Sequence, residues 1–150
     1  MIVLDTNVIS EVFRPTPDPG VIQWLESLND DVAITTITLA ELLAGVRRLP
    51  VSRRKSDVKA TLGAALKPYR NTRSLLVFDD EAAEEYAEVL LAREQAGLPI
   101  TTADAQIAAI CRANDAICAT RNQKNFAETG IRVLNPWKAR HRDRDEHDVL

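Results

Sequence analysis

Short apolar runs alternate with segments whose apolar residues recur at helical spacing, and this alternation limits what the chain can fold into. The clearest run is Ile2 to Leu4, and others lie at 32–35, 75–78, 116–120 and 131–134. Continuous runs of this length are typical of strands buried on both faces of a parallel sheet. Strands that alternate with helices predict an α/β fold, here a five-stranded parallel sheet with right-handed crossovers and helices on both faces.

The segments between these runs predict helices. The expected inward residues are Val8, Ile9, Val12 and Phe13; Val21, Trp24, Leu25 and Leu28; Leu39, Leu42, Leu43, Val46 and Leu49; Val58, Leu62, Leu66 and Tyr69; Ala83, Tyr86, Ala87, Leu90 and Leu91; and Ile107, Ile110 and Cys111. Helix starts are expected at Asp18 with Pro19, at Asp79, and at Thr101 or Thr102. Across 52–73, Gly63 and Pro68 disfavour an unbroken helix.

The length of 150 residues suits one domain that needs neither disulfides nor a structural metal. We expect that domain at 1–137, followed by a charged, disordered tail at 138–150. The first residues do not match a signal peptide, and no apolar run approaches the roughly 20 residues of a membrane span. Cys111 and Cys118 are therefore expected to be buried, reduced thiols of a cytoplasmic protein.

Charge is unevenly distributed along the chain. The net charge of −3 argues against a general nucleic-acid coat protein. Between 47 and 73 the cations are Arg47, Arg48, Arg53, Arg54, Lys55, Lys59, Lys67, Arg70 and Arg73, opposed only by Asp57. Between 79 and 94 the acids are Asp79, Asp80, Glu81, Glu84, Glu85, Glu88 and Glu94, opposed only by Arg93. Both stretches fit solvated helix faces, and the basic one fits equally a surface that follows a phosphate backbone.

Three acids are expected at the edge of the sheet where the strands end. Asp5 ends the first strand, Glu41 is expected in the first turn after the second, and Asp104 in the first turn of the helix before the fourth. Carboxylates brought together repel one another unless a cation neutralises them. Ligation by oxygen alone suits Mg²⁺ or Mn²⁺, whereas zinc is disfavoured because His141 and His147 lie in the tail.

Such a site suits phosphodiester hydrolysis, since a divalent cation polarises the phosphoryl oxygen and acidifies a bound water. Thr6 and Asn7 could support the site beside Asp5, and Thr120 and Asn122 belong to the turn after the fourth strand, at the same edge. The sequence contains no Gly-x-Ser-x-Gly motif and no glycine-rich phosphate loop before a helix. Hydrolysis through a serine nucleophile is therefore disfavoured.

Each acid also has an ordinary structural role available. Asp5, with Thr6 and Asn7, could cap a helix, and Glu41 is placed to complete a capping box that begins at Thr38. Asp104 is an acid that the helix dipole favours. The convergence of all three acids on one edge favours a functional site over three separate caps.

Several segments resemble the VapC-type PIN-domain toxins, and the FitB-like branch most closely. They are Met1-Ile-Val-Leu-Asp-Thr-Asn-Val8, Thr38-Leu-Ala-Glu-Leu-Leu43, Asp104-Ala-Gln-Ile-Ala-Ala-Ile110, Ala119-Thr-Arg-Asn-Gln-Lys-Asn-Phe126 and Leu134-Asn-Pro-Trp137. These segments keep the order and spacing of the family from Met1 to about Trp137.

The resemblance implies a PIN fold and a Mg²⁺- or Mn²⁺-dependent endoribonuclease that acts as the toxin of a type II toxin-antitoxin system. It implies a homodimer and, with a VapB- or FitA-like antitoxin, a heterotetramer or larger assembly that meets DNA only through the antitoxin. The antitoxin's C-terminal segment would cover the active-site groove. Asp5, Glu41 and Asp104 match the family's metal-site acids, and Thr6 and Asn7 match the polar pair beside the first.

Asn122 and Asn125 depart from the family pattern, because many relatives have an acid at one or both positions. An amide supplies no charge, so the number of metal ions stays open between one and two. Two further functions also stay open: a regulatory subunit of a DNA-bound toxin-antitoxin complex with weak catalysis, and a PIN nuclease of RNA maturation that has no antitoxin. The RNA target is not encoded in any of these motifs.

Overall fold

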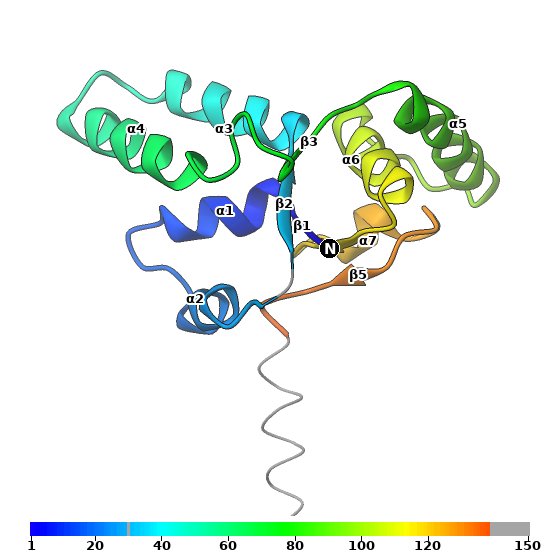
Figure 1. The fold of residues 1–150 in the computed structure, drawn as a ribbon, viewed down its shortest axis with the longest axis horizontal. Coiled ribbons are helices and arrows are strands. Elements are labelled where there is room, and N and C mark those ends of the chain that lie inside the picture. The colour runs from blue at the N-terminus through cyan, green and yellow to red at the C-terminus, as the bar shows by residue number, and fades with distance from the viewer. Residues whose placement is uncertain (30, 139–150) are drawn as a thin grey trace, which may run out of the picture.

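A computed structural model describes residues 1–29 and 31–138 of the chain (Figure 1). The elements are β1 (Ile2–Leu4), α1 (Thr6–Val12), α2 (Pro19–Glu26), β2 (Val32–Thr35), α3 (Thr36–Arg48), α4 (Arg53–Leu66), β3 (Leu75–Leu76), α5 (Asp80–Gln95), α6 (Thr102–Ala113), β4 (Ile117–Ala119), α7 (Gln123–Phe126) and β5 (Val133–Leu134). The predicted alternation of strands and helices is confirmed.

All five strands form one parallel sheet in the order β3-β2-β1-β4-β5. The first strand of the sequence is thus the central strand, with Val3 paired to Ala33 on one side and to Cys118 on the other. The predicted α/β class and five-stranded parallel sheet are confirmed. The carboxyl ends of β1, β2 and β4 lie side by side as a result, and the residues that follow them share one edge.

Helices cover both faces of the sheet, as predicted (Figure 1). Side chains of each strand alternate between the faces. Val3, Ala33 and Cys118 pack with α5 and α6, whereas Leu4 and Ile34 pack with α1, α3 and α4. The sheet therefore separates two apolar cores.

Three predicted strands and one predicted helical region are shorter in the structure. The runs 75–78, 116–120 and 131–134 contribute only Leu75–Leu76, Ile117–Ala119 and Val133–Leu134 to the sheet. Two of them, β3 and β5, are edge strands with one neighbour each. The region 52–73 is helical only over Arg53–Leu66, and Pro68, which has no backbone amide to continue the helical hydrogen bonds, lies two residues beyond its end.

The inward face of α5 is rotated relative to the prediction. Five residues that were predicted to face inward are exposed: Val12 of α1, Leu43 of α3, and Ala83, Ala87 and Leu91 of α5. On α5 the buried side chains are instead Ala82, Val89 and Arg93, and Tyr86 and Leu90 are partly buried as expected. The alanines on both sides of the helix made its apolar stripe ambiguous, and packing against α6 together with the burial of Arg93 selects the register.

Arg93 is a buried cation that joins three segments of backbone. Its guanidinium donates to the carbonyls of Lys124 and Ala127 at 3.1 and 2.8 Å, and to that of Pro99 at 2.6 Å. Only 4% of the residue is exposed, and its Nε has no hydrogen-bond partner in the described part of the chain. Arg93 therefore fixes the end of α5 to the loop before α6 and to the segment that contains α7.

Both cysteines are buried and free of disulfides, as predicted. None of the helices within 1–29 and 31–138 combines the length and hydropathy needed to cross a membrane. The tail expected at 138–150 falls, apart from Lys138, outside the described residues.

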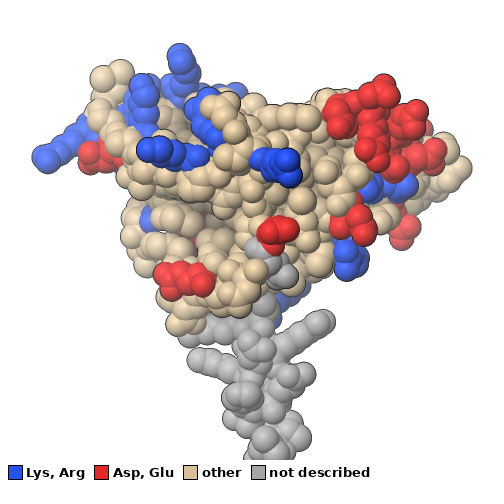
Figure 2. Space-filling model, viewed as in Figure 1, with Lys and Arg blue, Asp and Glu red and all other residues tan. Residues whose placement is uncertain are grey.

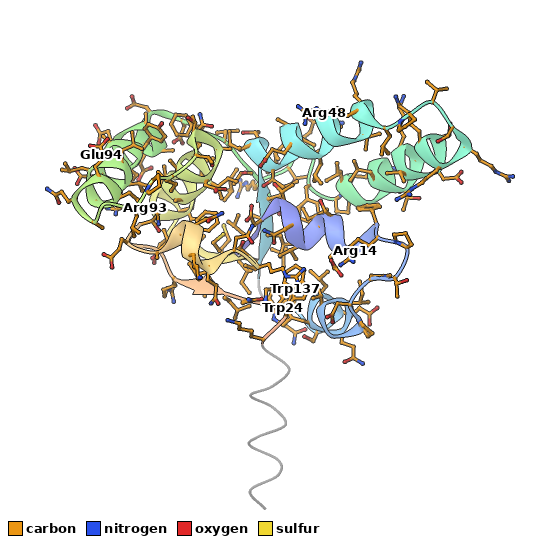
Figure 3. The ribbon with its side chains drawn as sticks, turned by 180° about the vertical axis from the view of Figure 1, so that it is seen from behind. Arg14, Trp24, Arg48, Arg93, Glu94 and Trp137 are labelled. Carbon is orange, nitrogen blue, oxygen red and sulfur yellow. The ribbon has the colours of Figure 1, made fainter. Side chains whose placement is uncertain are left out.

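Replacing Arg93 with methionine is expected to destabilise the fold by about 2 kcal/mol or more, because three carbonyls lose a charged donor. Urea denaturation would measure the change in the free energy of unfolding. Arg48, which lies exposed at the far end of α3 (Figure 3), gives the matched control, and Arg48→Met should change stability by no more than about 0.5 kcal/mol. Equal urea midpoints for the two variants would contradict a stabilising role for Arg93.

Candidate active site

The carboxylate of Asp5 lies at the end of β1 and is held by three donors. The Thr6 amide donates to Oδ1 at 2.8 Å, and the Thr120 hydroxyl and the Asn7 amide donate to Oδ2 at 2.8 and 3.1 Å. Asp5 is 5% exposed and caps α1, so its structural role and its place at the predicted site coexist. A carboxylate has about four acceptor positions, so about one remains open for a cation.

Thr120, the first residue after β4, uses the full hydrogen-bonding capacity of its hydroxyl. It donates to Asp5 and accepts from the side chain of Asn7 and the backbone amide of Asn122, each at 3.1 Å. Asn7 in turn accepts from the Arg121 amide at 3.1 Å. The turn after β4 is thereby tied to the start of α1, and the predicted supporting residues Thr120 and Asn7 meet at Asp5.

Glu41 lies in the second turn of α3, not in the first turn as predicted. The helix begins at Thr36, and its cap is Thr35, whose hydroxyl accepts from the Thr38 amide at 3.1 Å. The predicted capping box from Thr38 to Glu41 is therefore wrong. It failed because the last residue of β2 can itself cap the helix, which leaves Glu41 without a capping role.

Thr6 links Glu41 to the first strand. Its hydroxyl donates to Glu41 Oε1 at 2.9 Å and lies 3.2 Å from the hydroxyl of Thr38. A hydroxyl has one proton and a carboxylate only accepts, so Thr38 is the donor in the second bond. Thr38 is fully buried, and this supporting role, which sequence reasoning missed, was hidden by its assignment as a cap.

Asp104 lies in the first turn of α6, as predicted, with Thr101 as the cap. The Thr101 hydroxyl accepts from the backbone amide of Asp104 at 3.2 Å. No donor within 1–29 and 31–138 binds the Asp104 carboxylate, which is partly exposed. This carboxylate is therefore available to a ligand.

The three acids lie close enough to influence one another electrostatically. Burial raises the pKa of Asp5 above its ordinary value of 3.8, hydrogen bonds from Thr120 and Thr6 lower it, and the charges of Asp104 and Glu41 raise it again. The raised pKa means that the ionised form of Asp5 is costly in this position, and a nearby cation would offset that cost. The electrostatics thus fit the predicted cation.

The donor set fits Mg²⁺ or Mn²⁺ with water completing the coordination. Among the described residues, no three side chains of His, Cys, Asp or Glu lie close enough together to hold a metal ion as they stand. Mg²⁺ commonly binds through one or two carboxylates, keeps several waters and takes further oxygens from substrate phosphates. Asp5 and Asp104 each have an acceptor position left for such an ion.

Asn122 and Asn125 lie in the turn and short helix after β4. Asn122 precedes α7, is exposed, and makes no capping hydrogen bond with its side chain. Asn125 is exposed, and its backbone amide donates to the Asn122 carbonyl at 3.0 Å. Beside them Arg121 stacks over Trp137, with the guanidinium carbon 5.1 Å from the ring centre. This side of the site therefore offers uncharged amides rather than a fourth carboxylate.

A sequence profile of the PIN domain matches residues 2–131, which is most of the chain. The chain belongs to the PIN-domain family. The predicted family and fold are thus confirmed, with β1 and the acids that follow it inside the matched region.

Three relatives of this PIN-domain chain match it over nearly their whole length. The plasmid stability protein StbB of Pseudomonas syringae is 42% identical over 140 residues, covering 93% of this chain and 100% of the relative. The toxin FitB of Neisseria gonorrhoeae is 38% identical, covering 91% and 99%. The VapC ribonuclease Y4jK of Sinorhizobium fredii is 34% identical, covering 92% and 99%.

Two solved structures resemble the PIN domain closely. The crystal structure of FitAcB from Neisseria gonorrhoeae superposes with a TM-score of 0.85 at 37% identity, covering 91% of this chain and 99% of that one. VapBC2 from Rickettsia felis, bound to a DNA fragment from its promoter, gives a TM-score of 0.76 at 30% identity, with coverages of 90% and 98%. The chain is therefore similar in both sequence and fold to toxins of the FitB and VapC type.

The pKa of Asp5 is expected to fall when a neighbouring acid loses its charge, more in Asp104→Asn than in Glu41→Gln, since Asp104 raises it more. Carbon-13 NMR titration of the Asp5 carboxyl would measure the midpoint, with Glu81→Gln on the exposed face of α5 as the control. Because the folded pKa lies above 3.8, the contribution of Asp5 to stability is greatest below 3.8 and declines as pH rises through the folded pKa. A midpoint at or below 3.8 would contradict this account.

Proposed function

We propose that this chain is the toxin of a type II toxin-antitoxin system and a metal-dependent endoribonuclease that hydrolyses RNA with Asp5, Glu41 and Asp104. The observation that carries the proposal is the meeting of β1, α3 and α6 at one edge, where Asp5 experiences the charges of both other acids. Membership of the PIN-domain family and the likeness to FitB and the VapC ribonuclease support the same reading.

Mg²⁺ or Mn²⁺, held by Asp5 and Asp104 with Glu41 nearby, would polarise the phosphoryl oxygen and lower the pKa of a bound water. Thr120 and Asn7 keep the Asp5 carboxylate oriented through their hydrogen bonds. Glu41 uses Oε1 to accept from Thr6, so Oε2 is free to accept the proton of the attacking water.

Asn122 lies beside the proposed site, since its backbone amide donates to the Thr120 hydroxyl, and its side chain is an amide. An amide can orient a water or a phosphate oxygen by hydrogen bonding, although it adds no charge. One metal ion, completed by substrate oxygens, is the arrangement that this set of side chains supports best.

An antitoxin would cover this edge through apolar contacts. A hollow of about 160 Å³ between α1, α3 and α4 is lined by Thr6 and Glu41 together with apolar side chains such as Leu42. A neighbouring hollow of about 300 Å³ between α1, α2 and α4 is apolar, and Phe13 lines both. Adjoining apolar hollows suit an amphipathic helix, which would cover the Thr6 and Glu41 side of the site.

The same proposal places the toxin in the cytoplasm as a homodimer that meets promoter DNA only through its antitoxin. The structure of VapBC2 bound to a promoter fragment supports this arrangement by likeness. The free, buried state of Cys111 and Cys118 is in keeping with a reducing compartment.

The first test is cleavage of total and transfer RNA by the purified chain, freed of antitoxin, with Mg²⁺, Mn²⁺ or EDTA. Cleavage should require the metal and should fall by about a thousandfold or more in Asp5→Asn and Asp104→Asn, since each removes charge from the proposed metal site. Glu26→Gln at the exposed end of α2 is the control. Absence of cleavage with every metal would favour a regulatory subunit instead, and cleavage without any antitoxin gene nearby would favour RNA maturation.

Thr120→Val is expected to reduce metal-dependent cleavage by about 10- to 100-fold and to raise the pKa of Asp5 further, because it removes the hydroxyl donor to Oδ2. Thr120→Ser, which keeps the hydroxyl, should retain most of the activity. Circular dichroism would confirm that both variants fold. Full activity in Thr120→Val would show that Asp5 needs no orientation by this residue.

A further inference from the structure

Charge is divided across the molecule on either side of the proposed active site. Figure 2 shows the cations gathered over α3 and α4, and the acids over α5. Every cation of the basic stretch is exposed except Lys55, which is partly buried. The two charged stretches of the sequence have therefore become two opposed surfaces.

A groove of about 580 Å³ runs between α3 and α4 on the basic side. Leu43, Val46, Leu62 and Leu66 form its apolar lining, and Arg47, Lys55, Lys59 and Arg70 supply its charged lining, which contains no acid. Apolar surface flanked by cations suits a single nucleic-acid strand, whose bases have flat apolar faces and whose phosphates are anionic.

Neighbouring residues on the surface of α3 connect this groove to the proposed active site. Glu41, Ala44 and Arg47 follow one another at intervals of three residues, so each is a neighbour of the next on the surface of α3, and Arg47 lines the groove. The side chain between Glu41 and Arg47 on this path is the methyl group of Ala44. Nothing bulky on α3 separates the acids from the cations.

The opposite side of the site repels a phosphate backbone. Asp104 lies in the first turn of α6, and α5 packs against α6 in the same core. Asp80, Glu81, Glu84 and Glu88 of α5 are all exposed. A polyanion that reaches the site is therefore attracted by one flank and repelled by the other.

We propose that single-stranded RNA is held on one side only: the flank on one side of the cut phosphate runs over Ala44 and Arg47 into the basic groove between α3 and α4. On the other side of the cut phosphate, the RNA backbone makes no contact with α5. This inference rests on the proposed nuclease function, and adds to it a path for the substrate and a reason why cutting depends on flank length.

A second copy of the chain is a poor occupant of this groove. In a two-fold dimer the same patch meets itself, which would bring the cations lining one groove against those lining the other. An RNA strand instead neutralises these charges and releases counterions.

Binding of RNA can be tested with catalysis blocked by Asp5→Asn. Fluorescence anisotropy would compare single-stranded RNA of mixed sequence about 16 nucleotides long with one of about 4, over a range of salt. Adding Lys59→Glu should weaken binding of the long RNA several-fold and reduce its salt slope by about one, and should leave the short RNA unchanged. Arg132→Glu, which makes the same charge change at an exposed position away from the groove, should alter neither.

Gly63 provides a pair of variants within the groove itself. It lines the groove on α4, and a Cβ added there would meet nothing within 4 Å. Gly63→Glu and Gly63→Gln are matched in size, and both favour a helix more than glycine does. The long RNA should bind several-fold more weakly to Gly63→Glu than to Gly63→Gln.

The outcomes distinguish this proposal from the nuclease proposal. Equal binding of long RNA by Lys59→Glu and Arg132→Glu would overturn the groove as an RNA path, and so would loss of antitoxin binding in Lys59→Glu with RNA binding unchanged. A chain with intact Asp5 that binds long RNA through the groove but cleaves neither RNA with Mn²⁺ would overturn only the nuclease proposal.

Discussion

The carboxylate of Asp5 is buried, and the rest of the site is arranged around that constraint. A buried carboxylate needs donors, and they come from the start of α1 and from the turn after β4. The Thr120 hydroxyl connects the two segments, because it donates to Asp5 and accepts from Asn7. The parallel order of the sheet makes this possible, because it places the ends of β1 and β4 side by side. Burial and two neighbouring acids nevertheless keep the pKa of Asp5 raised, so the protein alone leaves the charge incompletely compensated. That residual cost is what a cation would relieve.

Local sequence signals predicted the parts of the fold that depend on local chemistry. The apolar run before Asp5 gave the central strand, and Asp79 and Thr101 were identified as possible caps from residue type and position alone. Glu41 was expected in the first turn of its helix but lies in the second, since Thr35 rather than Thr38 caps α3. The assignment of Glu41 to the site does not depend on that error, because the family motif, unlike the capping pattern, does not depend on where the helix begins.

Tertiary contacts account for what could not be predicted. The face of α5 was misassigned because its alanines fit either register, and only packing against α6 distinguishes them. Arg93 looked like an ordinary surface cation, yet it is buried because three carbonyls from distant segments converge on it. Likewise, the position of the basic stretch in space was not predictable, because only the packing of α3 and α4 places its cations around a groove. The distribution of charge in space, rather than the net charge, gives the molecule its polarity.

The two edge strands, β3 and β5, contain only two residues each. An exposed sheet edge is a template on which a foreign strand can pair through backbone hydrogen bonds, and short edges limit that pairing. A partner therefore finds little backbone to extend here, so recognition by strand addition is disfavoured. Binding must instead rely on side chains in the hollows between helices. The choice of partner then depends on the identity of those side chains, so related chains can keep the same sheet and still discriminate among partners.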